Sequence, residues 1–280
     1  MALADLIQKT ANSGIRYWIS PDTTKPALIF IHGFTGNHEG FQYLVPLLTD
    51  FTVIVPDLPG FGESPLEDDG WSIEGIAQKT NHFVTSLKLS SKPFLISHSM
   101  GTLMAASMLE QNPELFQTKT IFISPVPTKV RIFDSRKIGA VLGSLQYRIG
   151  SIPKLGPALV KSHRLTKAVT SLMVTTKDRQ FRTVINNHHI NNLLYISDIR
   201  FYHKIHTDIN KVGIDDKAAS LAPFDVLFIV GDKDNVTPLR KVKKAGQHIG
   251  AELVIMPGVG HLAHYETPEL IISAIREFLQ

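Results

Sequence analysis

The chain has 280 residues, of which 43% are hydrophobic and 19% charged, and its formal net charge is +4. This composition supplies enough apolar side chains for a large core and argues against a disordered chain. The sequence contains no cysteine, which excludes disulfides, a thiolate nucleophile and cysteine-ligated zinc. It shows neither an N-terminal export signal nor 18 uninterrupted apolar residues, so we expect a cytoplasmic protein without a transmembrane segment.

The first half of the chain is predicted to alternate short buried strands with amphipathic helices. Apolar runs rich in β-branched or aromatic residues predict an antiparallel edge strand at 15–19 and further strands at 27–32, 52–57, 93–98 and 120–124. Helical patterns lie at about 40–49, 72–89 and 100–112. The alternation returns late, with strands at 225–231 and 252–256 and helices near 239–249 and 268–279. This order predicts an α/β fold with a mostly parallel sheet flanked by helices.

Residues 126–217 interrupt the alternation, because they show helical periodicity without a convincing strand. They hold 16 Lys and Arg against six Asp and Glu, a net charge of +10, whereas the rest of the chain has a net charge of −6. Two interpretations are open: a solvated helical surface, or a lid that attracts anionic substrates or an anionic membrane surface. The basic residues are dispersed and match no nucleic-acid-binding motif, so we expect no nucleic-acid partner.

The segment PFLISHSMGTLMAASML, residues 93–109, is the first with a chemical signature. A predicted strand ends just before Ser99 and a predicted helix begins just after it, as in the sharp turn that exposes a nucleophilic serine. That turn needs small residues two positions before and two after the serine. Gly101 meets this need, and Ser97 replaces the usual glycine with only a hydroxymethyl group more. On its own, the pattern is also compatible with an ordinary serine-rich turn.

Two later segments hold the residues that a serine nucleophile requires. A serine hydroxyl becomes a good nucleophile when a histidine takes its proton and an acid orients that histidine. Asp232 and Asp234 follow the predicted strand 225–231, and His261 follows the predicted strand 252–256. The carboxyl ends of parallel strands meet at one edge of the sheet, so these side chains are expected close to Ser99.

Taken together, these segments resemble the α/β-hydrolase-fold serine hydrolases. Residues 32–36, HGFTG, resemble the family's oxyanion loop, and residues 57–64, DLPGFGES, resemble its D-x-x-G-x-G-x-S turn. Gly231-x-x-Asp234-x-x-x-Pro238 and Gly260-His261 match its acid and histidine motifs. The resemblance implies an α/β-hydrolase core domain at 1–125 and 218–280, with a helical cap, or lid, at 126–217.

The resemblance also implies a catalytic role for each matching residue. Ser99 would be the nucleophile, His261 the general base and then acid, and Asp234 the orienting carboxylate. Asp232 is the rival acid, but it stands one residue after Gly231 where the family pattern has three. The oxyanion hole would be formed by two backbone N–H groups, those of Phe34 and Met100.

From this resemblance we expect a capped, esterase- or lipase-like carboxylic-ester hydrolase that works through an acyl-enzyme without a cofactor or metal. Its partner would be a small-molecule ester, anionic or amphiphilic, with lactones and monoacylglycerol-like esters as further candidates. Serine at position 99, where haloalkane dehalogenases and epoxide hydrolases have aspartate, argues against those two chemistries. The alternatives that keep the same triad are a cofactor-free haloperoxidase or perhydrolase, a carbon–carbon bond hydrolase and an acyltransferase. A non-catalytic ligand-binding receptor is a further alternative.

Several other residues have simpler structural interpretations. We expect His98 to pack or hydrogen-bond beneath the serine turn, His32 to hold the oxyanion loop and Asp57 to brace loops. His264 is expected at the surface or next to the site. The spacings of His188-His189 and of His203 and His206 fit no common metal site, so we expect no bound metal. The candidates for the wall of a pocket under the cap, or for the core of the cap itself, are Leu142, Leu145, Leu172, Met173, Ile190, Leu193 and Leu194.

Overall fold

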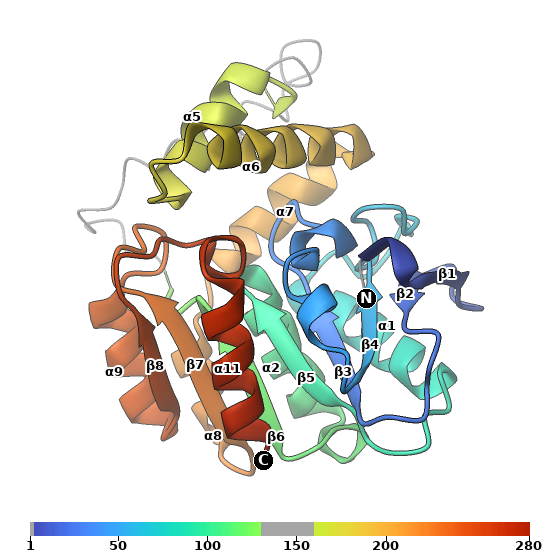
Figure 1. Ribbon diagram of the computed structural model, residues 1–280. Coiled ribbons are helices and arrows are strands. Elements are labelled where there is room, and N and C mark those ends of the chain that lie inside the picture. The colour runs from blue at the N-terminus through green and yellow to red at the C-terminus, as the bar shows by residue number, and fades with distance from the viewer. Residues whose placement is uncertain (1–2, 130–159) are drawn as a thin grey trace.

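The computed structural model describes residues 3–129 and 160–280. Their strands form one eight-stranded sheet in the order β1-β2-β4-β3-β5-β6-β7-β8 (Figure 1). The first strands, β1 (Ile7–Thr10) and β2 (Arg16–Ile19), pair antiparallel, and β2 is also antiparallel to β4 (Thr52–Pro56). All the remaining pairs are parallel. The predicted α/β class with a mostly parallel sheet is therefore confirmed.

The central strands are short and apolar because both of their faces are covered. They are β3 (Ala27–Ile31), β5 (Phe94–His98), β6 (Lys119–Ile123), β7 (Asp225–Gly231) and β8 (Glu252–Met256). Alternate residues enter different hydrophobic clusters: Ile29 and Ile31 belong to one, whereas Leu28 and Phe30 belong to the other. The sheet thus separates two cores.

Helices cover both faces of the sheet (Figure 1). The cluster that contains Ile29 is covered by α1 (Ile73–Ser86), α2 (Met100–Gln111) and α9 (Leu239–Ile249). The cluster that contains Leu28 is covered by α11 (Pro268–Leu279) and by two 3₁₀ helices, η2 (His38–Phe41) and η3 (Val45–Leu47). The shorter elements are η1 (Leu3–Asp5), η4 (Pro113–Leu115), α8 (Ala218–Leu221) and α10 (Ala263–Glu266).

Two predictions of local structure differ from the fold. The α-helix predicted at about 40–49 is wrong, because the chain there forms η2 and η3 with a break between them. Gly40 destabilises an α-helix, and Pro46 has no N–H to donate to one. The apolar residues of this stretch are therefore buried by two short 3₁₀ helices and not by one continuous α-helix. Strand β1 was not among the predicted strands, because its four residues are all exposed and carry no hydrophobic pattern.

The described part of the predicted cap, residues 160–217, is helical and contains no strand. It consists of α5 (His163–Met173), α6 (Arg179–Asn192), η5 (Leu193–Tyr195), α7 (Ile199–Ile209) and η6 (Ile214–Lys217). We call residues 160–217 the cap segment. Helices α5 and α6 lie beyond one end of the sheet (Figure 1). The two ends of the predicted insertion meet, since the N–H of Ile214 donates to the carbonyl of Val126 at 2.9 Å.

Candidate active site

Ser99 lies in a strained turn between β5 and α2. Its backbone has φ 54° and ψ −123°, a conformation that side-chain-bearing residues rarely adopt. The turn projects Ser99, which is partly exposed, from the carboxyl end of a buried strand. The sequence prediction of a strand, a sharp turn and a helix at this serine is therefore met by the backbone geometry.

The turn is tight because its neighbours leave no room for larger residues. A Cβ added to Gly101 would lie 2.4 Å from the carbonyl oxygen of Ile31, so only glycine fits there. Ser97 is fully buried, and its hydroxyl has no hydrogen-bond partner. The hydroxymethyl group is thus accommodated, at the cost of an unsatisfied polar atom.

His261 lies within hydrogen-bond distance of Ser99 on one side and Asp234 on the other. Its Nε2 is 2.9 Å from Ser99 Oγ, and its Nδ1 is 2.8 Å from Asp234 Oδ2. A carboxylate only accepts hydrogen bonds, so Nδ1 carries the proton and Nε2 is left to accept from the serine hydroxyl. His261 and Asp234 are 1% and 3% exposed, so water competes little for this chain of contacts.

Asp234 is held as a carboxylate by its surroundings. Its Oδ1 accepts from the N–H groups of Val236 and Thr237, and its Oδ2 also accepts from the Thr237 hydroxyl, all at 2.6–2.7 Å. Burial alone would raise the pKa of Asp234, but attraction to His261 and hydrogen bonds from His261 and Thr237 lower it to about 2. The rival, Asp232, instead accepts from the N–H of Gly258 at 2.7 Å.

The predicted oxyanion loop passes directly beside Ser99. A Cβ added to Gly33 would be 3.2 Å from Ser99 Cβ and 3.1 Å from His98 Nδ1. The next residue, Phe34, packs its ring near Phe61 and Tyr202. On the other side of the serine, Met100 is the first residue of α2, so its N–H has no acceptor within the helix. Gly33, the residue before Phe34, thus lies against Ser99, and Met100 follows Ser99 directly in the chain.

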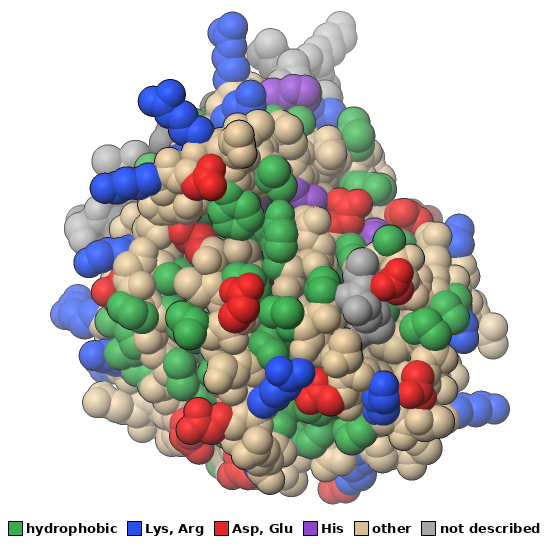
Figure 2. Space-filling view, in the orientation of Figure 1, with side chains coloured by type: hydrophobic (Ala, Val, Ile, Leu, Met, Phe, Trp, Pro, Cys, Tyr) green, Lys and Arg blue, Asp and Glu red, His purple; other side chains and the backbone are tan. Residues whose placement is uncertain are grey.

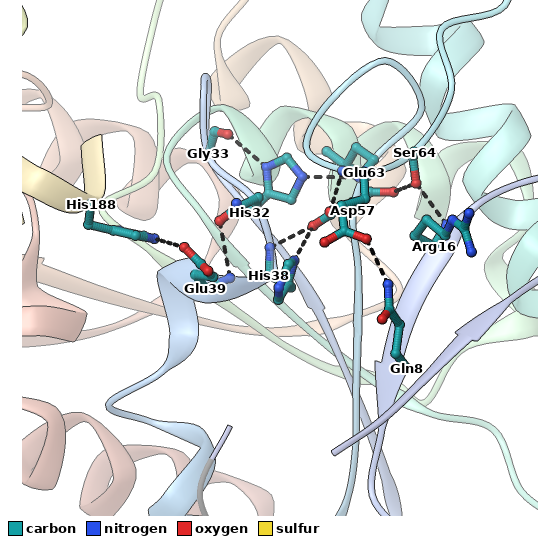
Figure 3. A network of polar contacts seen from close by, with 12 residues as sticks. Gln8, Arg16, His32, Gly33, His38, Glu39, Asp57, Glu63, Ser64 and His188 are labelled. Carbon is teal, nitrogen blue, oxygen red and sulfur yellow. Dashed lines mark hydrogen bonds and ion pairs between the residues drawn. The ribbon is translucent and has the colours of Figure 1, made fainter. Parts of the chain in front are cut away.

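His32 holds this loop through both ring nitrogens, as predicted. Its Nδ1 donates to the carbonyl of Gly33 at 2.9 Å, and its Nε2 accepts from the N–H of Leu58 at 3.0 Å (Figure 3). Burial lowers the pKa of His32, which favours the neutral ring that this pattern requires. His32 therefore links the oxyanion loop to the turn after β4.

Asp57 accepts hydrogen bonds from residues of the same region through both of its carboxylate oxygens. Its Oδ1 accepts from the N–H and Nδ1 of His38 at 2.6 and 3.0 Å, and its Oδ2 accepts from the N–H of Glu63 at 2.7 Å (Figure 3). A Cβ added to Gly62 would lie 2.1 Å from Asp57 Oδ2, which explains the glycine at that position. The structural interpretation of Asp57 agrees with these contacts.

His98 and His264 form a buried layer under the serine turn. His98 Nε2 donates to the carbonyl of His261 at 3.2 Å, as expected for a residue beneath the turn. Burial, followed by repulsion from His261, lowers the pKa of His98 to about 3. The ring of His264 lies 4.1 Å from that of His98, and its side chain is 3% exposed. The prediction that His264 lies at the surface is therefore wrong, and the alternative, a position next to the site, agrees with its contact with His98.

Two histidines of the cap segment, His188 and His206, contact residues of the core. His188 Nε2 lies 3.1 Å from Glu39 Oε2 (Figure 3), and its Nδ1 contacts the hydroxyl of Tyr265. The ring of His206 packs 5.6 Å from that of Phe34. Within residues 3–129 and 160–280, no three His, Asp or Glu side chains are grouped so that they could hold a metal ion. The sequence did not predict the link from His188 to Glu39 and Tyr265, since no local pattern connects residues so far apart.

The pocket-wall candidates are only partly supported. Leu172 and Leu194 are 52% and 79% exposed, so neither lines an enclosed wall. Leu193 is buried in the cluster that α1 and α2 cover, and Met173 packs against Val174 and Tyr265. Leu142 and Leu145 lie outside the described residues.

Comparisons with known proteins agree with this architecture. A curated relative, an sn-1-specific diacylglycerol lipase of Mus musculus, is 25% identical over 92% of this chain and 82% of its own length. A monoacylglycerol lipase of Xenopus laevis is 26% identical over 91% of this chain and 75% of its own length. A solved structure of a thermophilic esterase from Thermogutta terrifontis has a TM-score of 0.77 at 19% identity, covering 98% of this chain and 97% of that one.

The family itself is identified by a family model. The model described as "alpha/beta hydrolase fold" matches residues 26–268, which includes every residue of the candidate site. The lipases and esterases among the similar proteins support the predicted class of carboxylic-ester hydrolase. No helix in the described part of the chain is long and apolar enough to cross a membrane. The chain belongs to the alpha/beta hydrolase fold family.

Proposed function

We propose that this protein hydrolyses carboxylic esters through a covalent acyl-enzyme formed on Ser99. The observation that carries the proposal is the chain of contacts from Ser99 Oγ through His261 to Asp234, at 2.9 and 2.8 Å. Ser99 is the partly exposed end of this chain and the other two residues are buried, which suits a nucleophile that must reach a substrate.

In the first half-reaction, Ser99 Oγ attacks the ester carbonyl carbon while His261 Nε2 takes the hydroxyl proton. Asp234 keeps the Nδ1 proton in place and stabilises the imidazolium that forms. The tetrahedral intermediate then collapses: the bond to the alkoxy oxygen breaks and His261 returns the proton to that oxygen. The alcohol leaves, and the acyl group remains on Ser99.

The negative oxygen of the tetrahedral intermediate would be bound by the N–H groups of Met100 and Phe34. Met100 contributes the first N–H of α2, at the positive end of the helix dipole. Removing one such donor typically lowers kcat by roughly 10²–10³-fold, so the position of residues 33–34 matters for rate. His32 supports that position through its bonds to Gly33 and Leu58.

The second half-reaction repeats these roles with water. His261 Nε2 removes a proton from a water molecule, which attacks the acyl carbon. The second tetrahedral intermediate expels Ser99 Oγ, which is reprotonated by His261, and the carboxylic acid is released. Every proton moves through side chains of this chain, so the proposed cycle uses no metal or cofactor.

For the substrate we propose an amphiphilic ester with an apolar acyl chain, such as a monoacylglycerol-like ester. The names of the lipase relatives support this class. The partly exposed ring of Phe34, in the loop that passes beside Ser99, packs on the fully buried rings of Phe61 and Tyr202 and would give an apolar acyl chain a contact there. We further propose that residues 126–217 act as the cap that selects the acyl group.

The test is a panel of p-nitrophenyl esters from acetate to palmitate, with lactones added, run on the wild type and on Ser99→Ala. We expect the wild type to hydrolyse the esters, the variant to fall to the uncatalysed rate, and dialysis against EDTA to change nothing. Absence of ester hydrolysis by a folded wild type would contradict the proposal. Peroxide- and acetate-dependent halide oxidation, or ligand binding without turnover, would then point to the alternatives.

A further inference from the structure

The loop that carries His261 is bound to the cap segment through its backbone. The N–H of His261 donates to the carbonyl of Met173, the last residue of α5, at 2.8 Å, and the N–H of Leu262 reaches the same oxygen at 3.4 Å. The carbonyl of His261 accepts from Ser124 Oγ at 3.0 Å and from His98 at 3.2 Å. The N–H of His261 is therefore bound by the cap, and its carbonyl is bound by the core.

One carboxylate, that of Glu266, fixes the cap side of this contact. Its Oε2 accepts from the N–H groups of Thr175 and Thr176 at 2.9 and 2.7 Å and lies 2.7 Å from the Thr175 hydroxyl. Its Oε1 accepts from the N–H of Gly260, next to His261, at 3.1 Å. A single side chain thus binds the cap residues just after Met173 and the core residue just before His261.

Two further contacts limit movement at this junction. The Thr175 hydroxyl is also 2.7 Å from the carbonyl of Gly258, so its proton can serve either acceptor. Arg182 on α6 donates to the carbonyls of Thr176 and Ser171 at 3.1 and 3.4 Å, which holds the same stretch from the cap side. A Cβ added to Gly260 would lie 2.5 Å from the carbonyl of Met173, so the two backbones are in close contact.

From this geometry we infer that Glu266 is a positioning residue for the catalytic histidine, and that it makes the cap and the histidine loop one mechanical unit. The inference rests on the proposed role of His261. Without Glu266, three N–H groups lose a charged acceptor, and the contact of Thr175 and Thr176 with the loop is weakened. A shift of about 1 Å in a catalytic group can lower the rate by about 10²-fold.

A role in positioning predicts a defect that does not depend on the acyl group. His261 takes part in every turnover, so Glu266→Ala should lower kcat by 10- to 100-fold for acetate and palmitate esters alike, with a smaller change in KM. A residue that only anchors the cap would instead change KM, and mostly for long acyl chains. Glu266→Gln keeps one acceptor oxygen for the three donors of Thr175 and Thr176 and should recover part of the lost kcat.

The control is Glu269→Ala, which removes an exposed carboxylate three residues further on and should leave kcat unchanged. Thr175→Val removes only a hydroxyl and should cause a smaller version of the Glu266→Ala defect. A readout independent of activity is hydrogen–deuterium exchange at the His261 amide, which should quicken in Glu266→Ala because its bond to Met173 is loosened. Thermal unfolding identifies the variants that fold.

The outcomes separate this inference from the proposed function. If the wild type hydrolyses no ester, the proposed function fails, whatever Glu266 does. If the wild type is active and a folded Glu266→Ala keeps its kcat and its slow exchange at His261, the inference is overturned. A defect confined to long acyl chains also overturns it. If Glu266→Ala does not fold, the same comparison is made with Glu266→Gln and Thr175→Val.

Discussion

On the sheet side of Ser99 the chain is held by backbone ladders and fully buried apolar side chains, whereas on the cap side it is held by packed helices and individual polar side chains. Strands β3, β5 and β6 run side by side under the serine turn, and Ile31, Ile96 and Phe122 are completely buried. Across the site, the cap segment contacts the core loops through Glu266 and His188. The nucleophile thus rests on paired strands, whereas the cap segment joins the core without strand pairing, through side-chain packing and individual hydrogen bonds.

The two sides also differ in charge. Residues 126–217 have a net charge of +10 and the rest of the chain −6. Figure 2 shows Lys and Arg side chains projecting from the upper part of the molecule, where α5 and α6 lie. We propose that the core carries the chemistry and that the cap selects the substrate. Each of the following predictions tests one part of this division.

The largest expected effect is on the core side. Asp234→Asn should lower kcat by about 10⁴-fold without unfolding the protein, because the amide favours the wrong tautomer of His261. Asp232→Asn is the matched control and should cost far less, since Asp232 accepts from the N–H of Gly258 and not from His261. Steady-state kinetics on a short ester measures both. The reverse order of the two defects would transfer the acid role to Asp232.

The next effect concerns packing under the serine turn. Ser97→Leu should destabilise the protein by about 3 kcal/mol or more and abolish activity, because the fully buried site has no room for a larger side chain. Ser97→Gly removes the unsatisfied hydroxyl and should keep activity within a few fold. Urea unfolding and ester hydrolysis give both values. Full activity in the leucine variant would show that the turn is not tight.

On the cap side, His188→Ala should destabilise the protein by roughly 2 kcal/mol, because it removes the hydrogen bond between His188 and the buried hydroxyl of Tyr265. Glu39→Gln should cost less, since Glu39 is partly exposed. Thermal unfolding measures the loss, and kcat on acetate esters should change less than KM on long-chain esters. An unchanged unfolding temperature would mean that His188 does not join the cap to the core.

The smallest effect is electrostatic. If the basic cap attracts acidic substrates, kcat/KM for an anionic ester should fall severalfold between about 20 and about 500 mM salt, and that for a neutral ester should fall much less. Kinetics at several salt concentrations test this directly. Equal dependence for the two esters would leave the cap charge as an ordinary solvated surface.

Much of the core fold could be predicted because the sequence patterns of its strands and motifs lie within short contiguous segments. Each apolar run gave a strand, and the serine turn and the segments carrying Asp234 and His261 follow strands whose order was readable. The links from Glu266 to Thr175 and from His188 to Tyr265 could not be predicted, since they join residues 91 and 77 positions apart. The apolar spacing does not predict the break between η2 and η3, because Gly40 and Pro46 disfavour a continuous α-helix whatever that spacing.

The central claim, that Ser99 is the activated nucleophile, is tested most directly by labelling with an organophosphonate followed by mass spectrometry. The contact with His261 predicts a single adduct on Ser99 and none on Ser97, which is buried two residues away. Labelling should be lost in Ser99→Ala and strongly slowed in Asp234→Asn. An adduct on Ser97, or no adduct on a preparation that hydrolyses esters, would contradict the account.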